Sequence, residues 1–276
     1  MIIGVHASVR AGLVWALEEA RALECESLQI LPYPRHHDPS VEELAEFAAA
    51  RRALALKILL VHSRFVPSLA SREPRRRALS VAHLAHELRL CAGLGGDAYV
   101  LHAGAYSPGD SFEDGARAFA ESVRRAICDA RFSGEILLEN VPGGGRRMGA
   151  TLEELAALRD ALGAGVRAGF CLDTAHAWAA GYDLSRVEGV WRLLVRARRL
   201  LGEDGVRAFH LNDTRALLGS GRENHWHWGQ GRLGTECLGA FVRREEFAAT
   251  PAILETPKEP GADAANLALA RSLAAA

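Results

Sequence analysis

Short apolar segments recur along the chain, and six of them end in a residue that can bind a metal. Each contains a few Val, Ile, Leu, Phe or Ala residues, a pattern typical of a strand buried on both faces. The six are ILLVH ending at His62, YVLH at His102, ILLE at Glu139, FCLD at Asp173, AFH at His210 and AILE at Glu255. IIGVHA near residues 2–7 and LQILPY near 28–33 precede them. The pattern therefore predicts eight strands.

Helical patterns fill the intervals between these strands. Capping-box sequences predict helix starts at Ser40–Glu43, Thr151–Glu154 and Ser185–Glu188, with a weaker one at Asp110–Glu113. Expected helix ends are marked by Gly93, Gly163 and Gly202. The alternation of strands and helices, with no linker or change in composition, predicts an α/β fold, a single (β/α)8 TIM barrel over residues 1–276. A doubly wound sheet is the rival, but it gathers ligands at one switch point.

In a barrel the C-terminal ends of all strands surround one mouth, so the polar residues that end these strands should converge there. The candidate ligands are His62, His102, His176, His210 and His225, with Glu139, Asp173, Glu223 and Glu255. Each one alone is explained as a hydrogen-bonded residue at a strand end, but together they favour divalent metal, which offsets the cost of gathering them. Nitrogen and oxygen donors without thiolate suit zinc, manganese or iron. Two or three such ions are typical of in-line displacement at phosphorus.

Composition narrows the setting of the protein. The net charge of −1 gives no sign of a nucleic-acid partner, although a local basic patch needs no overall excess. The five cysteines form no CxxC pair and suggest a reducing compartment. The start of the chain, MIIGVHAS, lacks the pattern of a signal peptide, and no apolar run is long enough to span a bilayer. We expect a cytoplasmic protein with no membrane segment.

Four segments resemble the signature of the endonuclease IV family of apurinic/apyrimidinic endonucleases. They are ILLENVPGGG (136–145), GFCLDTAHAWAAGYDL (169–184), AFHLNDTRALLGSGRENHWHWGQGRLG (208–234) and ILETP (253–257). The similarity extends over essentially the whole chain. It implies a xylose-isomerase-like TIM barrel with three zinc ions that cuts duplex DNA 5′ to abasic sites, leaving a 3′-hydroxyl and a 5′-deoxyribose phosphate. Mn²⁺ or Fe²⁺ in place of Zn²⁺, and additional 3′-end trimming, stay open, and a monomer is expected.

The resemblance also implies a role for each candidate ligand. The first ion would be held by His62, His102 and Glu139, the second by Glu139 as a bridge with Asp173, His210 and Glu255, and the third by His176, Glu223 and His225. Glu139 and Glu255 would be the catalytic carboxylates. Glu223 stands where the family has Asp, and His227 in the segment His225-Trp-His-Trp is an alternative ligand.

Contacts with double-stranded DNA containing abasic sites follow from the same resemblance. Arg35 and Phe65-Val66 match positions that the family uses to enter the duplex beside a flipped-out abasic nucleotide. Arg64, Arg222 and Arg232 lie on loops expected at the same mouth, where they would contact phosphates. Simple loop packing explains Phe65 equally well.

Two other functions are compatible with the pattern. A divalent-metal-dependent sugar isomerase or epimerase on the same kind of barrel also needs His, Glu and Asp at strand ends, but it does not require His176, His225 or arginine-lined loops. A catalytically silent DNA- or metabolite-binding barrel would follow if Glu223 and the altered segment 225–228 disable the third site.

Overall fold

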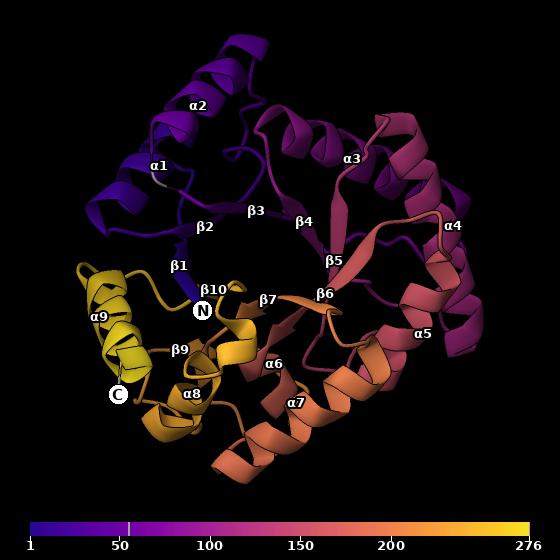
Figure 1. The fold of residues 1–276 in the computed structure, drawn as a ribbon. Helices are drawn as coiled ribbons and strands as arrows, with labels where there is room; N and C mark the ends of the chain where they lie inside the picture. Colours follow the sequence, from indigo (N-terminus) through magenta and orange to yellow (C-terminus); the bar gives the residue numbers. More distant parts are fainter. Residues whose placement is uncertain (55, 276) are drawn as a thin grey trace.

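Eight parallel strands form a closed barrel in the computed structural model, which describes residues 1–54 and 56–275. The order around the barrel is β1-β10-β7-β6-β5-β4-β3-β2 (Figure 1). The strands are β1 (Ile2–His6), β2 (Ser27–Ile30), β3 (Ile58–His62), β4 (Ala98–Leu101), β5 (Glu135–Glu139), β6 (Ala168–Asp173), β7 (Val206–His210) and β10 (Pro251–Leu254). The predicted TIM barrel is confirmed, and every predicted strand overlaps an observed one.

Helices form a ring around the barrel (Figure 1). They are α1 (Leu13–Ala22), α2 (Val41–Ala53), α3 (Pro74–Gly93), α4 (Phe112–Ala130), α5 (Leu152–Leu162), α7 (Val187–Leu201), α8 (Gly234–Val242) and α9 (Ala262–Ala275). The Arg271 guanidinium of α9 donates to the carbonyls of Leu23 and Glu24 at the end of α1, which joins the last helix to the first. Within the described residues, no helix combines the length and apolar character needed to cross a bilayer.

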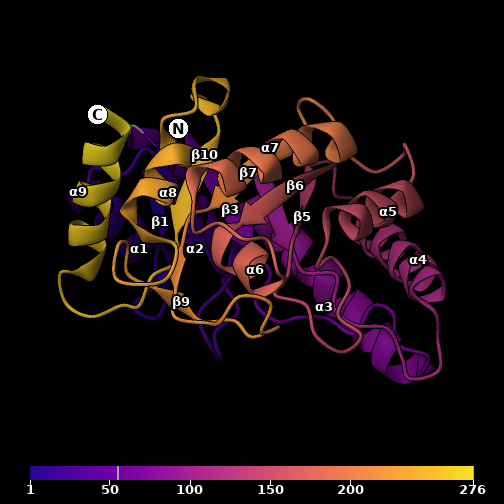
Figure 2. The ribbon, with the colours of Figure 1, turned by 90° about the horizontal axis from the view of Figure 1, so that it is seen from below.

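Shorter elements lie among the loops at the C-terminal ends of the strands. They are α6 (Thr174–Ala179) and the two-residue strands β8 (Asp213–Thr214) and β9 (His225–Trp226), which pair antiparallel. Figure 2 shows α6 and β9 at the same end of the barrel. The hairpin of β8 and β9 therefore lies over the barrel mouth. A separate 3-10 turn, η1 (Glu245–Phe247), precedes the start of β10.

Alternation along each strand separates two cores. In β3, Leu59 and Val61 pack against the surrounding helices, whereas Leu60 belongs to a small cluster inside the barrel. Because side chains alternate with period two, His62 shares the inward face of Leu60. The interior cluster is Leu60, Ala98, Val100, Leu137, Cys171, Ala208 and Ile253. A candidate ligand follows two residues after the last interior residue of each of these six strands. The core thus fixes which side chains reach the mouth.

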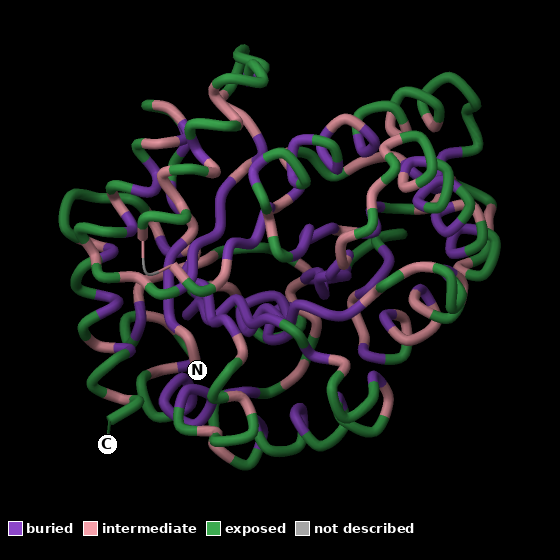
Figure 3. Tube along the Cα trace, turned by 45° about the horizontal axis from the view of Figure 1, so that its top comes forward, coloured by how far each residue is buried: buried purple, intermediate pink, exposed green. Residues whose placement is uncertain are grey.

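Burial follows the same division. Figure 3 shows buried residues concentrated in the central strands and exposed residues along the outer sides of the helices. Gly4 in β1 is required by close packing, because a Cβ at this position would lie 1.7 Å from the Ser27 carbonyl oxygen of β2. Helix α2 shows the predicted capping box, with Ser40 accepting from the Glu43 amide and Glu43 accepting from the Ser40 amide.

Of the other three predicted helix starts, the one at Thr151 is confirmed and the other two need correction. Helix α4 is capped by Ser111 and Asp114, one residue later than predicted, because the Ser111 hydroxyl is the group that accepts the third amide. Thr151 accepts from the Glu154 amide, but the Glu154 carboxylate accepts from the amides of residues 149 and 150 instead of closing a box. The Ser185 box is wrong, because its hydroxyl donates to Asp183 and α7 begins without a side-chain cap.

Candidate metal centre

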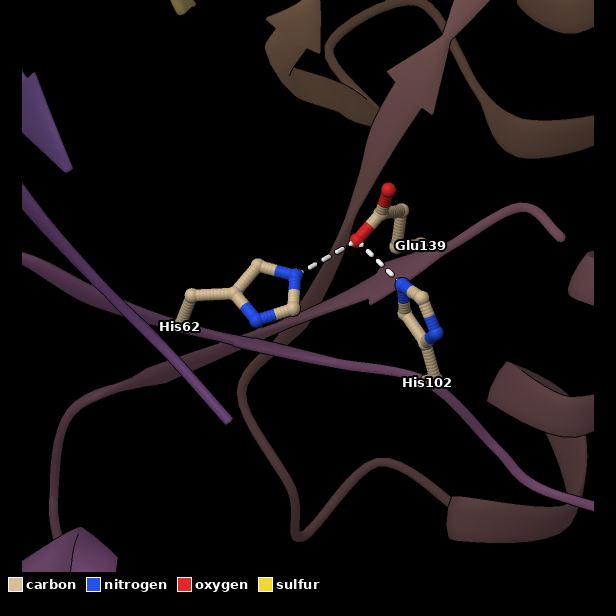
Figure 4. A group of neighbouring side chains, drawn as sticks. All are labelled: His62, His102 and Glu139. Carbon is tan, nitrogen blue, oxygen red and sulfur yellow. Dashed lines mark hydrogen bonds and ion pairs between the residues drawn. The ribbon is translucent and has the colours of Figure 1, made fainter. Parts of the chain in front are cut away.

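The His62, His102 and Glu139 side chains meet at the mouth of the barrel (Figure 4). The Glu139 Oε2 atom lies 2.9 Å from Nε2 of His62 and 2.7 Å from Nε2 of His102. These residues come from three neighbouring strands or strand ends, β3, β4 and β5. Glu139 is 1% exposed, so its carboxylate depends on these imidazoles for compensation. The three residues form the first group that could hold a metal ion.

A second group surrounds the other oxygen of the same carboxylate. It consists of Glu139, Asp173, His210 and Glu255. His210 Nδ1 lies 2.9 Å from Glu139 Oε1 and 3.2 Å from Glu255 Oε2. Because each oxygen of Glu139 faces a different group, this carboxylate lies between the first and the second group.

The third group contains Asp173, His176 and His225. Asp173 ends β6 and caps α6, with its Oδ1 accepting from the His176 amide at 2.6 Å, so the cap itself places His176. His225 arrives on the β8–β9 hairpin, with Nε2 3.3 Å from Asp173 Oδ2. Glu223, expected in this set, is exposed, and its Oε2 lies 3.6 Å from His176 Nε2. This contact with His176 lowers the pKa of Glu223 to about 2.

Backbone carbonyls fix which nitrogen of three imidazoles faces the cluster. Nδ1 of His62 donates to the Ser63 carbonyl at 2.8 Å, and Nδ1 of His176 donates to the Asn140 carbonyl at 2.9 Å. Nδ1 of His225 donates to the Glu255 carbonyl at 3.3 Å. A carbonyl oxygen can only accept, so Nδ1 carries the proton in each ring and Nε2 is directed inward. This arrangement is typical of metal-binding histidines.

The interpretation of the sequence missed Gln29, which is fully buried on the inward face of β2. Its side-chain oxygen accepts from His210 Nε2 at 2.8 Å, and its amide nitrogen donates to Glu255 Oε1 at 2.7 Å and to His6 Nδ1 at 2.9 Å. Gln29 therefore sets the orientation of His210 and Glu255 together. The signal was its place in the inward column of a strand, but an amide alone does not indicate a metal site.

Two asparagines that follow strand ends hold Asp173 and Glu255 in place. Asn140 accepts from the Asp173 amide at 2.6 Å, and Asn212 Nδ2 donates to Asp173 Oδ2 at 2.7 Å. Asn212 also accepts from the Glu255 amide. Asp213, the next residue, accepts from the amides of Gly231 and Leu233 and thereby holds the following loop.

The electrostatics of the cluster follow from burial and proximity. Burial by itself raises the pKa of Glu139, but the His102 and His210 imidazoles outweigh it and hold this pKa well below the usual range. Burial lowers the pKa of His176 and His210, yet the surrounding acidic groups raise both well above the usual value. Without metal, protons on these imidazoles balance the carboxylates. A divalent cation would balance the same charge and release those protons.

Two buried imidazole nitrogens of the third group form no hydrogen bond with the described part of the chain, although a carboxylate oxygen lies 3.6 Å from one, in Glu223, and 3.3 Å from the other, in Asp173. Nε2 of His176 and Nε2 of His225 are buried and have no hydrogen-bond partner among the described residues. The two rings lie side by side, with centroids 5.1 Å apart. A buried polar nitrogen without a partner costs about 1–3 kcal/mol. Both rings belong to the third group, whose ligand atoms lie within 4.8 Å of one another, so the donor set fits a metal ion there.

The residues that follow His225 lie outside the donor groups. His227, the alternative ligand, contacts Glu259 at 3.2 Å and Asn266 at 3.1 Å and belongs to none of the groups found in the described residues. Trp228 is buried, and its indole donates to the Leu211 carbonyl, so it packs the rim. Trp226 lies under the Arg215 guanidinium at 3.4 Å from the ring centroid.

The residues expected to contact DNA surround the mouth or lie on its loops. A pocket of about 400 Å³ contains most of the donors and is also lined by Arg64. A neighbouring pocket of about 550 Å³ shares His102 and Glu223 with the first and is lined by Val66 and Arg222. Phe65 and Val66 are 62% and 61% exposed. The remaining two, Arg35 and Arg232, are also exposed.

Fold and site together define the class of protein: a parallel barrel with a histidine and carboxylate cluster at its mouth. The family model described as a xylose isomerase-like TIM barrel matches residues 17–274. The chain is 35% identical over 261 residues to a probable endonuclease 4 of Geobacter sulfurreducens, covering 93% of this chain and 88% of the relative. The chain belongs to the endonuclease IV family.

Solved structures agree with this assignment. Endonuclease IV from Thermus thermophilus superimposes with a TM-score of 0.85 at 32% identity, covering 99% of this chain and 98% of that one. A D-tagatose 3-epimerase-like protein reaches a TM-score of 0.73 at 19% identity over 99% of this chain and 97% of its own. The second likeness concerns the fold alone.

Proposed function

We propose that the protein hydrolyses the phosphodiester on the 5′ side of abasic sites in duplex DNA and leaves a 3′-hydroxyl and a 5′-deoxyribose phosphate. The observation that carries the proposal is the gathering of overlapping donor groups at the barrel mouth, where the Glu139 and Asp173 carboxylates each belong to two of them. Family membership supplies the substrate, which geometry alone does not give.

Three zinc ions are the proposed cofactors, with Mn²⁺ or Fe²⁺ as substitutes. His62, His102 and Glu139 would hold the first, and Glu139, Asp173, His210 and Glu255 the second. His176 and His225 would hold the third, with Glu223 reaching it from the loop before β9. Bound ions would activate water and neutralise charge on the phosphoryl and leaving oxygens. Glu139 and Glu255 would orient the water and the phosphoryl group at the base of the site. There Gln29 holds Glu255 and His210 in place by hydrogen bonds.

The loops around the mouth fit a duplex with a missing base. The exposed Phe65 and Val66 would fill the space left in the stack, and the extrusion of a nucleotide without a base costs little. The neighbouring pocket has apolar walls at Val141 and Pro142 and arginines at its edge, which suits a sugar flanked by phosphates. Arg35, Arg64, Arg222 and Arg232 are proposed as the phosphate contacts of this surface.

The test is incision of a labelled duplex that contains one abasic site, compared with the same duplex without it. We expect a single cut 5′ to the abasic site, loss of cutting after chelation and recovery with Zn²⁺. Metal analysis of the same sample should give about three ions per chain. If metal-loaded protein leaves the abasic duplex intact, the proposal is wrong, and about one ion per chain with ketose epimerisation would favour the isomerase instead.

A further inference from the structure

Glu87 of α3 is a buried carboxylate that the proposed hydrolysis does not use. It is 4% exposed, and the buried Tyr99 hydroxyl of β4 donates to its Oε2 atom. A carboxylate in such a place needs several donors to compensate for lost hydration. The remaining donors come from two loops at the barrel mouth.

The loop after β2 supplies one donor and the loop after β3 another. The Tyr33 hydroxyl donates to Glu87 Oε1 at 3.2 Å, and the Arg64 backbone amide donates to Oε2 at 3.1 Å. Arg35 lies two residues after Tyr33, and Phe65 directly follows Arg64. We call residues 31–37 and 63–67 the loop pair. One carboxylate therefore contacts both members of the loop pair, next to the residues proposed to enter DNA.

The Arg64 side chain ties the two loops to each other. Its Nη1 donates to the Tyr33 carbonyl at 2.6 Å, and its guanidinium lies 4.9 Å from the Tyr33 ring centroid and 5.6 Å from that of Phe65. Phe65 is thus stacked against a cation that is itself fixed, although the ring is largely exposed. Glu87 is the buried end of this chain of contacts.

A residue that enters a duplex gains from being held in place beforehand. Ordering a loop and its side chains at the moment of binding costs free energy, and a rigid arrangement avoids that loss. Hydrogen bonds in a dry environment are stronger than those exposed to water. Glu87 supplies a buried acceptor to both loops at once.

We propose that Glu87 is a positioning residue for recognition of the abasic site. It holds the loop pair in one arrangement, so that Arg35 and Phe65 meet the duplex together. The recognition role rests on the proposed function, whereas the holding of the loops is a property of the protein alone. The two parts can therefore be tested separately.

The first experiment is hydrogen exchange without DNA on three forms of the metal-loaded protein: wild type, Glu87→Leu and Leu88→Ala. Leu88 is a buried neighbour on α3 whose side chain makes no hydrogen bond, so its truncation matches the loss of stability without removing the acceptor. We expect Glu87→Leu to speed exchange of the Arg64 amide and of both loops at least about tenfold, the equivalent of one lost hydrogen bond. Equal exchange in the two variants overturns the proposal.

The second experiment measures DNA recognition with the same variants and with Glu87→Gln. A duplex with 2-aminopurine opposite the abasic site reports insertion of Phe65 by its fluorescence. We expect Glu87→Leu to lose this signal and to raise KM about tenfold with kcat within about threefold of wild type. Glu87→Gln should restore both, because an amide oxygen accepts from Arg64 and Tyr99 while its nitrogen donates to the Tyr33 hydroxyl oxygen.

The outcomes separate the two proposals. A fall in kcat without a change in KM, or an unchanged fluorescence signal in Glu87→Leu, overturns the role of Glu87 while leaving abasic-site incision by the wild type in place. If the wild type does not incise, the proposed function fails together with the recognition role. The exchange data then decide only whether Glu87 holds the loops.

Discussion

Replacement of Glu139 by glutamine tests the centre of the site with the smallest change of shape. Glu139 belongs to the first and the second donor group, whereas the third group of Asp173, His176 and His225 does not contain it. The amide has one acceptor oxygen and no charge, so the two groups that share Glu139 lose their common anion. We therefore expect the metal content of Glu139→Gln to fall from about three ions per chain to about one.

The size of the effect follows from the contacts of this carboxylate. In the metal-free protein it compensates His62, His102 and His210 at distances of 2.7–2.9 Å. Breaking a buried ion pair costs about 3–5 kcal/mol, so the metal-free variant should unfold more easily by roughly that amount. Loss of the ions removes several kcal/mol of transition-state stabilisation, and single-turnover incision should fall at least about 10³-fold.

The matched control is Glu135→Gln at the opposite end of the same strand. Glu135 is the first residue of β5, at the end of the strand opposite Glu139, and it contacts Arg207 at 3.4 Å. We therefore expect wild-type metal content and incision. Metal analysis, single-turnover incision and urea unfolding with and without chelator give the three readouts. Should Glu139→Gln keep about three ions and cut within about threefold of wild type, the bridging role is refuted.

Three further predictions concern the rim and the buried acid of α3. Glu223→Ala should lose about one ion and most of the incision, whereas Glu223→Asp should keep both, and metal analysis that gives about three ions for the alanine variant would exclude Glu223 as a ligand. Arg35→Ala and Phe65→Ala should each raise the Kd for abasic duplex by about tenfold in an anisotropy titration, because stacking and phosphate contacts contribute about 1–3 kcal/mol, with unchanged metal content. Burial raises the pKa of Glu87 above its ordinary value of 4.5. An acid with a raised folded pKa contributes stability that is present below the unfolded pKa and lost as pH rises through the folded pKa. Wild type should therefore lose stability relative to Glu87→Gln in urea unfolding as the pH rises above about 4.5, and a difference that stays constant with pH contradicts this.

The ends of the strands could be predicted because the barrel interior obeys a simple rule. Leu60 and His62, or Leu137 and Glu139, share the inward face of a strand, and the polar residue comes last. A polar side chain at that position lies in the mouth of the barrel and does not disrupt the apolar interior. The convergence of the donor residues could therefore be predicted from the order of apolar and polar residues along each strand.

Residues that act through distant partners gave no comparable signal. Gln29 lies on the inward face of β2, but an amide by itself does not indicate a metal site, so its contacts with His210 and Glu255 were not predicted. Glu87 follows the half-exposed His86 on a helix and resembles a solvated residue until Tyr99 and the two loops cover it. Both roles depend on partners from other parts of the chain, which periodicity within one segment cannot identify.

The third group also differs from the expected set in a way that geometry explains. The resemblance gave Asp173 to the second ion alone, yet the cap of α6 places it beside His176 and His225 as well. The groups thus form one coupled unit, linked through Glu139 on one side and Asp173 on the other. A site for one ion, as in the isomerase alternative, would compensate the first or second group and leave the inward nitrogens of His176 and His225 buried without a hydrogen bond to any described residue. A buried nitrogen without a hydrogen bond costs about 1–3 kcal/mol, and this cost supports the proposed multinuclear site.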